Sequence, residues 1–161
     1  MDVCEVCGLD RDAIGADEVI PRVRAGLTGF LDVLASESPS LAQRPTPDTW
    51  SVLEYSGHIR DVLLNQREGI VVALIEHEPV KQKMYRDERV NLGMYAPESA
   101  ADISQGIEVA GRLFANTYRA LTTEQLSRTA IYFGEPHTLT WVGAQAVHEV
   151  EHHLADVRRS A

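Results

Sequence analysis

The sequence has 161 residues, of which 44% are hydrophobic, and its 24 acidic and 15 basic side chains give a formal net charge of -9. This length and composition allow one domain to bury a core large enough to fold without disulfides. The negative charge repels phosphate backbones and anionic lipid, so we expect no nucleic-acid or membrane partner. No run reaches the roughly 18 to 20 apolar residues of a membrane-spanning helix, and the first residues do not resemble a signal peptide. The sequence predicts a cytoplasmic protein with a single domain over residues 1–161.

The first half of the chain contains two predicted helices joined by a proline-rich loop. Apolar residues at helical spacing predict the first helix over 16–35. The stretch 36–48 contains three prolines, which exclude a regular helix and indicate a connecting loop. Ser51 and Glu54 then stand at the spacing of a capping box, just before a long and mostly apolar run. This start signal predicts the second helix over 52–75.

The segment 76–97 is rich in charge, has little periodicity and is long for a loop in a compact domain. We interpret it as a functional flap. Helical spacing returns over 101–121 despite two interior glycines, which indicate a close contact with a neighbouring helix. Residues 122–126 are expected to form one short turn, and 131–138 a turn or brief hairpin.

The last helix is predicted to begin with Thr140 as its N-cap and to end near Arg158. One of its faces carries a stripe of aliphatic side chains, which are Val147, Val150, Leu154 and Val157. The opposite face is partly apolar as well, so the helix could be packed between neighbours on both sides. The sequence therefore predicts an all-α fold, a four-helix bundle with a long connection between its second and third helices.

Three of the six histidines lie within HEVEHH, residues 148–153, of the last predicted helix. Positions i and i+4 differ by only about 40° around a helix axis, so His148 and His152 share a face and can bind one ion. A zinc-like ion at a catalytic site takes at least three protein ligands. We expect the third to be His58, whose alternative role is that of a hydrogen-bonded core residue. His153 is the alternative to His152 if the buried face of the helix is rotated.

The remaining histidines and several carboxylates surround this predicted site. His77 and His137 have charged or turn neighbours and are interpreted as ordinary surface residues. Metal-bound imidazoles usually donate their second N–H to a carboxylate or carbonyl. Asp156 could accept such a bond on the last helix, and Glu54 or Asp61 could do so on the second. The alternative for each is a solvated acidic face.

Cys4 and Cys7 are the only cysteines and have the spacing and the trailing glycine of a zinc knuckle. They supply only half of a four-ligand structural site. Histidines or a dimer partner would have to supply the other donors. The alternatives are a pair without a ligand or a redox pair, although no strand precedes them as redox motifs normally require. Because the two residues are three apart, their role is local to the N-terminal segment 1–15.

A histidine in the second helix followed by HxxxH in the last one resembles the pattern of the DinB/YfiT-like superfamily. This family includes mycothiol-dependent maleylpyruvate isomerases and bacillithiol transferases. The residues that carry the resemblance are Trp50 and Ser51 in TWSVLEYSGHIRDV, His58 in the same stretch, and His148 and His152 in VHEVEHHLADV. It covers most of the chain and implies a four-helix bundle with a divalent metal, zinc or nickel, bound by these three histidines. In the isomerases an acidic residue can replace the first histidine of the last helix.

The resemblance also implies a chemistry. Family members of known activity use the metal to bind the thiol of mycothiol or bacillithiol, and the thiolate attacks or isomerises a small electrophile. A bound cation lowers the pKa of a thiol, which makes this chemistry physically reasonable. Glu149 and Glu151 are expected to point about 100° or more away from the face of His148 and His152. Three neutral ligands would then leave a position open for an anionic sulfur.

The sequence leaves two further functions open. One is a non-enzymatic metal-binding module of the stress response, and the other is an interaction protein whose histidines are core residues. An open site, facing a cleft lined by Arg or aromatic groups of segment 76–97, would favour the enzyme, whereas a closed site would favour the module. The expected partners are a small-molecule thiol and an electrophilic substrate, and a homodimer is left open.

Overall fold

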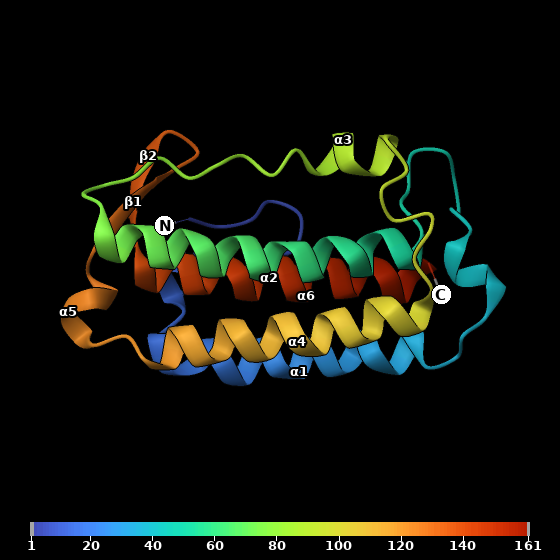
Figure 1. Cartoon of the computed structure of the whole chain (residues 1–161), viewed down its shortest axis with the longest axis horizontal. Coiled ribbons are helices and arrows are strands. Elements are labelled where there is room, and N and C mark those ends of the chain that lie inside the picture. Colours follow the sequence, from blue (N-terminus) through green and yellow to red (C-terminus); the bar gives the residue numbers. More distant parts are fainter. Residues whose placement is uncertain (1, 161) are drawn as a thin grey trace.

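The computed structural model describes residues 2–160 and shows four long helices lying side by side (Figure 1). These helices are α1, Ala16–Leu34, α2, Val52–Ile75, α4, Ala100–Arg119, and α6, Leu139–Ser160. Both α1 and α2 pack against α4 and α6, so α1 and α2 are diagonally opposed in the bundle. The prediction of a four-helix bundle is confirmed. Within the described residues, none of the helices combines the length and apolar character needed to cross a bilayer.

The helices α2, α4 and α6 begin at hydroxyl side chains that cap them. At the start of α2, the Ser51 hydroxyl accepts the Glu54 N–H at 3.2 Å and the Glu54 carboxylate accepts the Ser51 N–H at 2.8 Å, as the capping box predicts. For α6 the predicted cap is wrong. The Thr138 hydroxyl accepts the N–H of Trp141 at 3.2 Å, and Thr140 lies inside the helix. The preceding hairpin ends at Thr138 and continues directly into α6, so the last residue of the strand also caps the helix.

A short helix and a hairpin connect α4 to α6. The helix is α5, Thr123–Leu126, and the hairpin pairs β1, Thr129–Tyr132, with β2, Glu135–Thr138, in antiparallel register. Phe133 and Gly134 form its two-residue turn with φ values of 52° and 89°. Positive φ at both positions is the geometry of the turn that matches strand twist in a tight hairpin. The predicted short turn and brief hairpin are therefore confirmed.

The connection between α2 and α4, residues 76–97, follows the hairpin and α2 and then forms a short helix (Figure 1). Val80 makes a parallel bridge with Ile131 of β1, and the N–H of Lys81 donates to the Ile131 carbonyl at 3.0 Å. The helix is α3, Arg86–Asn91, which sequence periodicity did not indicate because it spans fewer than two turns. The flap is thus fastened at one end to the hairpin.

The chain before α1 lies against α6. Val3 and Asp10 form an antiparallel bridge, and the 3-10 turn η1, Arg11–Ala13, follows. The Trp141 indole N–H donates to the Asp2 carboxylate at 2.7 Å, which ties the start of this segment to α6. A second 3-10 turn, η2, Pro39–Ala42, lies in the loop between α1 and α2.

Close packing between the helices depends on small residues and on the aliphatic stripe of α6. A Cβ atom at Gly111 of α4 would collide with Leu27 of α1, and one at Gly106 would lie 2.6 Å from the Arg60 side chain of α2. The two interior glycines of α4 therefore mark close helix contacts, as predicted. The whole stripe predicted for α6 is buried, namely Val147, Val150, Leu154 and Val157.

Candidate metal centres

Potential ligands gather on both sides of α6. Within residues 2–160, three groups of side chains have ligand atoms that all lie within 4.8 Å of one another. These groups are His58, Glu149 and His153; Cys4, Cys7, His148 and His152; and His152, His153 and Asp156. The structure therefore brings His148 and His152 together and places His58 in a neighbouring group. A single ion bound by all three predicted histidines is not among these groups and stays a prediction.

The first group, His58, Glu149 and His153, lies between α2 and α6, and we call it the pocket centre. Oε2 of Glu149 is 3.5 Å from Nε2 of His58 and 3.4 Å from Nε2 of His153. A tetrahedral zinc ion with bonds of about 2.0 to 2.1 Å separates its ligand atoms by about 3.3 Å. The imidazole of His58 is 2% exposed, and neither of its nitrogens makes a hydrogen bond. Since buried polar atoms are normally paired, these nitrogens are suited to an ion.

Two neighbouring side chains orient the pocket centre. Nδ1 of His153 donates to Oδ2 of Asp156 at 2.9 Å, because an ionised carboxylate can only accept, and in the neutral ring this tautomer presents the lone pair of Nε2 toward Glu149. Nε2 of Gln145 donates to Oε1 of Glu149 at 2.7 Å, which leaves Oε2 toward the histidines. This is the supporting arrangement typical of metal sites. Asp156 is also 3.7 Å from His152, the histidine for which its support was predicted.

Burial sets the charge of the pocket centre. Burial lowers the pKa of His58, so the ring is neutral near pH 7. Burial opposes ionisation of Glu149, but the adjacent His153 and His58 hold the pKa of this carboxyl well below its usual range. The Trp50 indole covers one side, with its ring centre 5.4 Å from that of His58 and 6.3 Å from that of His153. The group therefore offers two imidazoles and one carboxylate in a sheltered position.

A cavity of about 650 Å³ reaches the pocket centre at His58 and Glu149. Its other walls come from α2, from the hairpin and from residues 80–88 of the flap. Lys81 is the most buried cation of these walls. Its Nζ donates to the Asn65 carbonyl at 3.0 Å and lies 5.0 Å from the centre of the Tyr132 ring. Burial lowers the pKa of Lys81 to about 8. Tyr85 and Arg86 of the flap complete a wall of aromatic and cationic groups.

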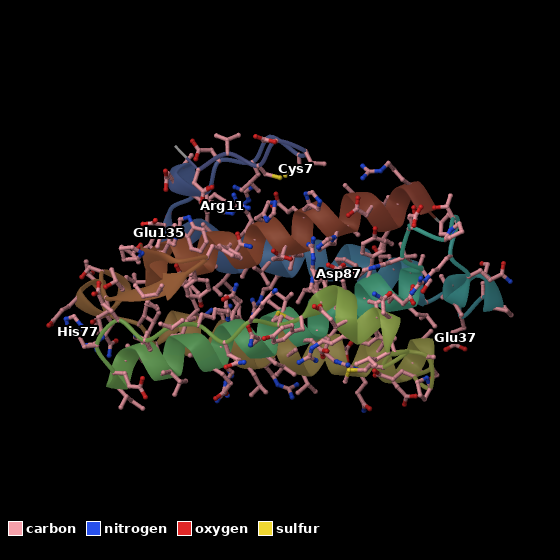
Figure 2. All side chains as sticks on the ribbon, turned by 90° about the horizontal axis from the view of Figure 1, so that it is seen from above. Cys7, Arg11, Glu37, His77, Asp87 and Glu135 are labelled. Carbon is pink, nitrogen blue, oxygen red and sulfur yellow. The ribbon has the colours of Figure 1, made fainter. Side chains whose placement is uncertain are left out.

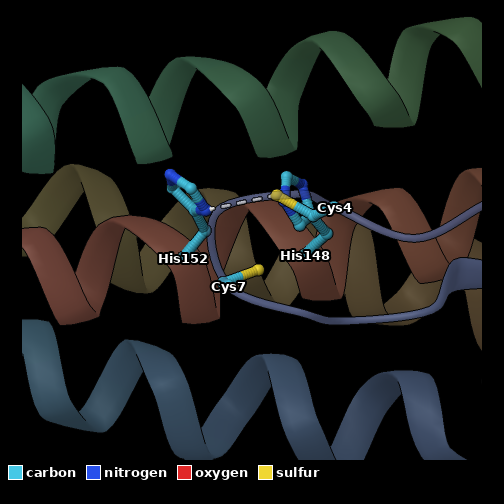
Figure 3. A group of neighbouring side chains, drawn as sticks. All are labelled: Cys4, Cys7, His148 and His152. Carbon is cyan, nitrogen blue, oxygen red and sulfur yellow. Dashed lines mark hydrogen bonds between the residues drawn. The ribbon is translucent and has the colours of Figure 1, made fainter.

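The second group lies on the side of α6 that the N-terminal segment covers. We call Cys4, Cys7, His148 and His152 the N-terminal centre. Figure 3 shows both cysteines on the loop that crosses α6, with the two imidazoles rising toward them. Sγ of Cys4 is 3.8 Å from Nδ1 of His152. From above, Figure 2 shows Cys7 and Arg11 over α6, whereas Asp87 of α3 lies on the opposite side of that helix.

A tight turn presents the two cysteines. The N–H of Gly8 donates to the Cys4 carbonyl at 2.8 Å, and the N–H of Cys4 donates to the Leu9 carbonyl at 2.9 Å. Gly8 has a φ of 74°, which L-residues other than glycine rarely adopt. The backbone N–H groups of Cys7 and Val6 lower the pKa of the Cys4 thiol, although partial burial opposes them. The turn therefore favours the thiolate at Cys4.

Arg11 connects the two centres. Its Nη2 lies 3.1 Å from Nδ1 of His148, and a guanidinium only donates, so that nitrogen carries the lone pair of the ring. Burial and the Arg11 charge lower the pKa of His148 to about 4. Nε of Arg11 donates to Oε1 of Gln145, the residue that donates to Glu149. A line of hydrogen bonds thus runs from the N-terminal segment to the pocket centre.

The other residues considered in the sequence have different surroundings. The His77 side chain is 93% exposed, and the His137 ring stacks on Trp141 with centres 3.8 Å apart. Neither belongs to a group of potential ligands within the described chain. Glu54 completes the cap of α2, and Asp61 accepts the Tyr95 hydroxyl at 3.0 Å. Neither carboxylate orients His58, which has no hydrogen bond at either nitrogen.

Sequence reasoning missed Glu149. Its rotation of about 100° from His148 was expected to turn it away from the metal. This rotation instead aims it at α2, where His58 is buried. Glu149 and His153 have the same i, i+4 spacing as His148 and His152, so spacing alone could not separate the two pairs. The useful signal was the position of His153 near the aliphatic stripe, which placed it toward the core.

Comparisons with known proteins agree with this architecture. A family model described as the DinB superfamily matches residues 22–157. YfiT from Bacillus subtilis, described as a probable metal-dependent hydrolase with an unusual four-helix bundle topology, has a TM-score of 0.77 and 19% identity, over 94% of this chain and 90% of that one. The mycothiol-dependent maleylpyruvate isomerase has a TM-score of 0.69 and 14% identity, over 92% of this chain and 63% of its own. At these identities the likeness concerns the fold alone. No protein of curated function matches the sequence.

Proposed function

The chain belongs to the DinB superfamily, and we propose that it is a divalent-metal-dependent enzyme that transfers a small-molecule thiol to a small electrophile or isomerises that electrophile. One observation carries the proposal. Nε2 of His58, Oε2 of Glu149 and Nε2 of His153 converge beside a cavity of about 650 Å³. Three ligands next to a cavity are typical of a catalytic metal, which keeps a coordination position for water or substrate.

The donor set fits zinc or nickel. Two imidazoles and one carboxylate form one of the ligand sets of catalytic zinc, and imidazole also suits nickel. The neutral histidines and the single carboxylate would leave one positive charge on a divalent ion, which favours an anionic ligand from the cavity. When bound, the metal would lower the pKa of a thiol and stabilise its thiolate near pH 7.

The chain's own side chains would position the reactants. Gln145 and Asp156 hold Glu149 and His153 in fixed orientations by the hydrogen bonds described above. Lys81 places a buried cation in the wall of the cavity, where it would attract a carboxylate or another anionic group of a substrate. The flap supplies Tyr85 and Arg86 to the same wall. These groups match the open site with aromatic and cationic walls that an enzyme is expected to have.

Mycothiol or bacillithiol is the thiol that we propose as cosubstrate. The support is the likeness of fold to a mycothiol-dependent isomerase, together with the charge balance at the pocket centre. A non-enzymatic metal-binding module is the alternative function. It would need no cavity, whereas His58 and Glu149 both line one.

Cobalt substitution tests the proposal. A thiolate bound to cobalt gives a sulfur-to-metal charge-transfer band in the near ultraviolet. The protein's own cysteines are removed first in the double variant Cys4→Ser/Cys7→Ser, so that any band comes from the added thiol. We expect mycothiol, bacillithiol or a simple thiol to produce the band, and we expect Glu149→Gln to abolish it. If cobalt is retained and no thiol gives a band, the metal is closed to thiols and the module replaces the transferase.

The same double variant separates the two ligand sets for the pocket ion. In that background His152→Gln leaves the set of His58, Glu149 and His153 intact. We expect the pocket ion to be retained. Its loss would instead support the ion bound by His58, His148 and His152 that the sequence predicted.

A further inference from the structure

We propose that Cys4, Cys7, His148 and His152 bind a second ion, a structural zinc that fastens the N-terminal segment to α6. Their ligand atoms all lie within 4.8 Å of one another. Two of them come from a loop at the start of the chain and two from the last helix, so the group closes a connection between distant parts of the sequence (Figure 3). The inference stands on this group alone and does not depend on the pocket centre.

The donor set and its dimensions fit zinc. Two thiolates and two imidazoles in a tetrahedral arrangement are characteristic of structural zinc. With bonds of about 2.3 Å to sulfur and about 2.0 Å to nitrogen, such an ion separates its ligand atoms by about 3.3 to 3.8 Å. Sγ of Cys4 and Nδ1 of His152 are already 3.8 Å apart. Because no two ligand atoms of the group are more than 4.8 Å apart, side-chain movements of only about 1 Å would bring them to these separations.

The loop is built as a thiolate-binding turn. Cys4, Cys7 and Gly8 have the spacing of a zinc knuckle, and the backbone N–H groups of Cys7 and Val6 face the sulfur of Cys4. Gly8 takes the positive φ that allows the chain to turn back toward α6. The bridge between Val3 and Asp10 closes the loop behind the cysteines. The backbone contacts of the loop therefore already give it this conformation.

The imidazoles of His148 and His152 are also oriented for metal binding. Nδ1 of His152 faces Cys4, and its Nε2 lies 3.7 Å from Asp156, the carboxylate–histidine arrangement that supports a metal ligand. The lone pair of His148 is on Nδ1, where Arg11 now donates to it. An ion would take the place of Arg11 there, and Arg11 would keep its bonds to Asp2 and Gln145.

The position of this group explains why it would be structural. None of its four residues lines the cavity beside the pocket centre. Four protein ligands fill a tetrahedral ion and leave no position for substrate. The ion would hold the loop on α6, and Arg11, which follows that loop, would keep its bond to Gln145, the residue that donates to Glu149.

Metal analysis of untagged protein tests the proposal. We expect zinc at both centres of the wild type and loss of one equivalent in Cys4→Ser/Cys7→Ser. Val6→Ser is the matched control, because Val6 is 77% exposed in the same loop and offers no ligand. It should keep both equivalents. Cobalt-substituted wild type should show a sulfur-to-metal band without added thiol, and Glu149→Gln should retain that band. Because Glu149→Gln changes only the pocket centre, it shows whether the N-terminal centre binds metal even if the proposed function is wrong.

A readout of the loop itself completes the test. Loss of zinc should release the segment before α1, so trypsin should cut the double variant after Arg11 faster than it cuts the wild type or Val6→Ser. Circular dichroism checks that the helices remain. The proposal is overturned if cobalt-substituted wild type shows no sulfur-to-metal band without added thiol, if the cysteines of zinc-supplied wild type are joined as a disulfide, or if the double variant keeps every zinc equivalent.

Discussion

The pocket centre and the N-terminal centre use neighbouring residues of the same helix and differ in what covers them. His148 and His152 are each followed by a residue of the pocket centre, Glu149 and His153, and one step along a helix turns a side chain by about 100°. One pair therefore faces His58 on α2 and a cavity, and the other faces two cysteines on a loop. Helix α6 thus contains two pairs at i, i+4 spacing. The segment that faces each pair, α2 with its cavity or the loop with its cysteines, determines whether an ion bound there would keep an open coordination position.

Removal of the two cysteines is expected to have the largest effect on the protein. If the N-terminal centre is structural, its ion binds only the folded chain and stabilises it by mass action, by about 4 kcal/mol when free zinc is about 1,000 times the dissociation constant. For a chain of this size that corresponds to about 10 °C in melting temperature. We expect Cys4→Ser/Cys7→Ser to lose this increment, as measured by thermal unfolding with and without zinc. An unchanged melting temperature in excess zinc would mean that the loop does not depend on a metal.

Glu149→Gln addresses the other centre. The amide keeps the size of the side chain but removes the charge that faces His58 and His153. We expect the affinity of the pocket centre for metal to fall by more than about 100-fold, because even supporting residues of metal sites are worth about 10- to 100-fold. Competition with a chelating dye measures this change. Glu151→Gln is the control, because Glu151 pairs with Arg22 and belongs to neither centre. Equal losses in both variants would point to a general effect of charge on α6.

A smaller effect is expected where the two centres meet. Gln145→Leu removes the donor to Oε1 of Glu149 and the acceptor for Arg11. The pocket centre should lose about 10- to 100-fold in metal affinity, as supporting residues of metal sites do. The N-terminal centre should keep its zinc, since all four of its ligands remain. Titration of cobalt into the variant resolves the two centres by the sulfur-to-metal band. A larger loss at the cysteines than at Glu149 would reverse the assigned role of Gln145.

The fold was accessible from the sequence because its signals are local. The capping box at Ser51 and Glu54 fixed the start of α2, and helical spacing located the other long helices. The six residues of α3 are too few to show a period. The sequence predicted Thr140 as the cap of α6, and Thr138 takes that place, because nothing in the sequence shows that the hairpin continues directly into the helix.

The site was accessible only in part. His58 and the dense HEVEHH stretch pointed to the two helices that carry the pocket centre, and the cysteine spacing indicated half of a zinc knuckle. What the sequence could not supply was the path of residues 2–10, which brings Cys4 and Cys7 over His148 and His152. Without that path these histidines had no partners other than His58. Contacts between segments about 140 residues apart in the sequence leave no periodic signal in either one.

The smallest effect concerns Lys81, in the cavity of the pocket centre. Burial lowers its pKa to about 8, against about 10.4 in an unfolded chain. Between these values the unfolded chain binds more protons than the folded one, so the free energy of unfolding rises with pH over that window. Below about pH 8 the folded protein carries the full unfavourable effect of a buried cation. Such a group destabilises the fold at pH 7 and provides a positive charge in the cavity beside the pocket centre.

We therefore expect Lys81→Met to be more stable than the wild type at pH 7, by about 1 kcal/mol after the lost hydrogen bond to Asn65 is subtracted. The difference should shrink as the pH rises from 8 to 10, because the wild-type lysine loses its charge. Urea unfolding at pH 7 and pH 10 measures both values, with the exposed Lys83→Met as control. A variant that is more stable and also binds small anions more weakly would show that Lys81 lowers the free energy of unfolding but contributes to anion binding in the cavity. The N-terminal centre, in contrast, is expected to raise the free energy of unfolding. A variant less stable than the wild type at pH 7 would instead make Lys81 a structural residue.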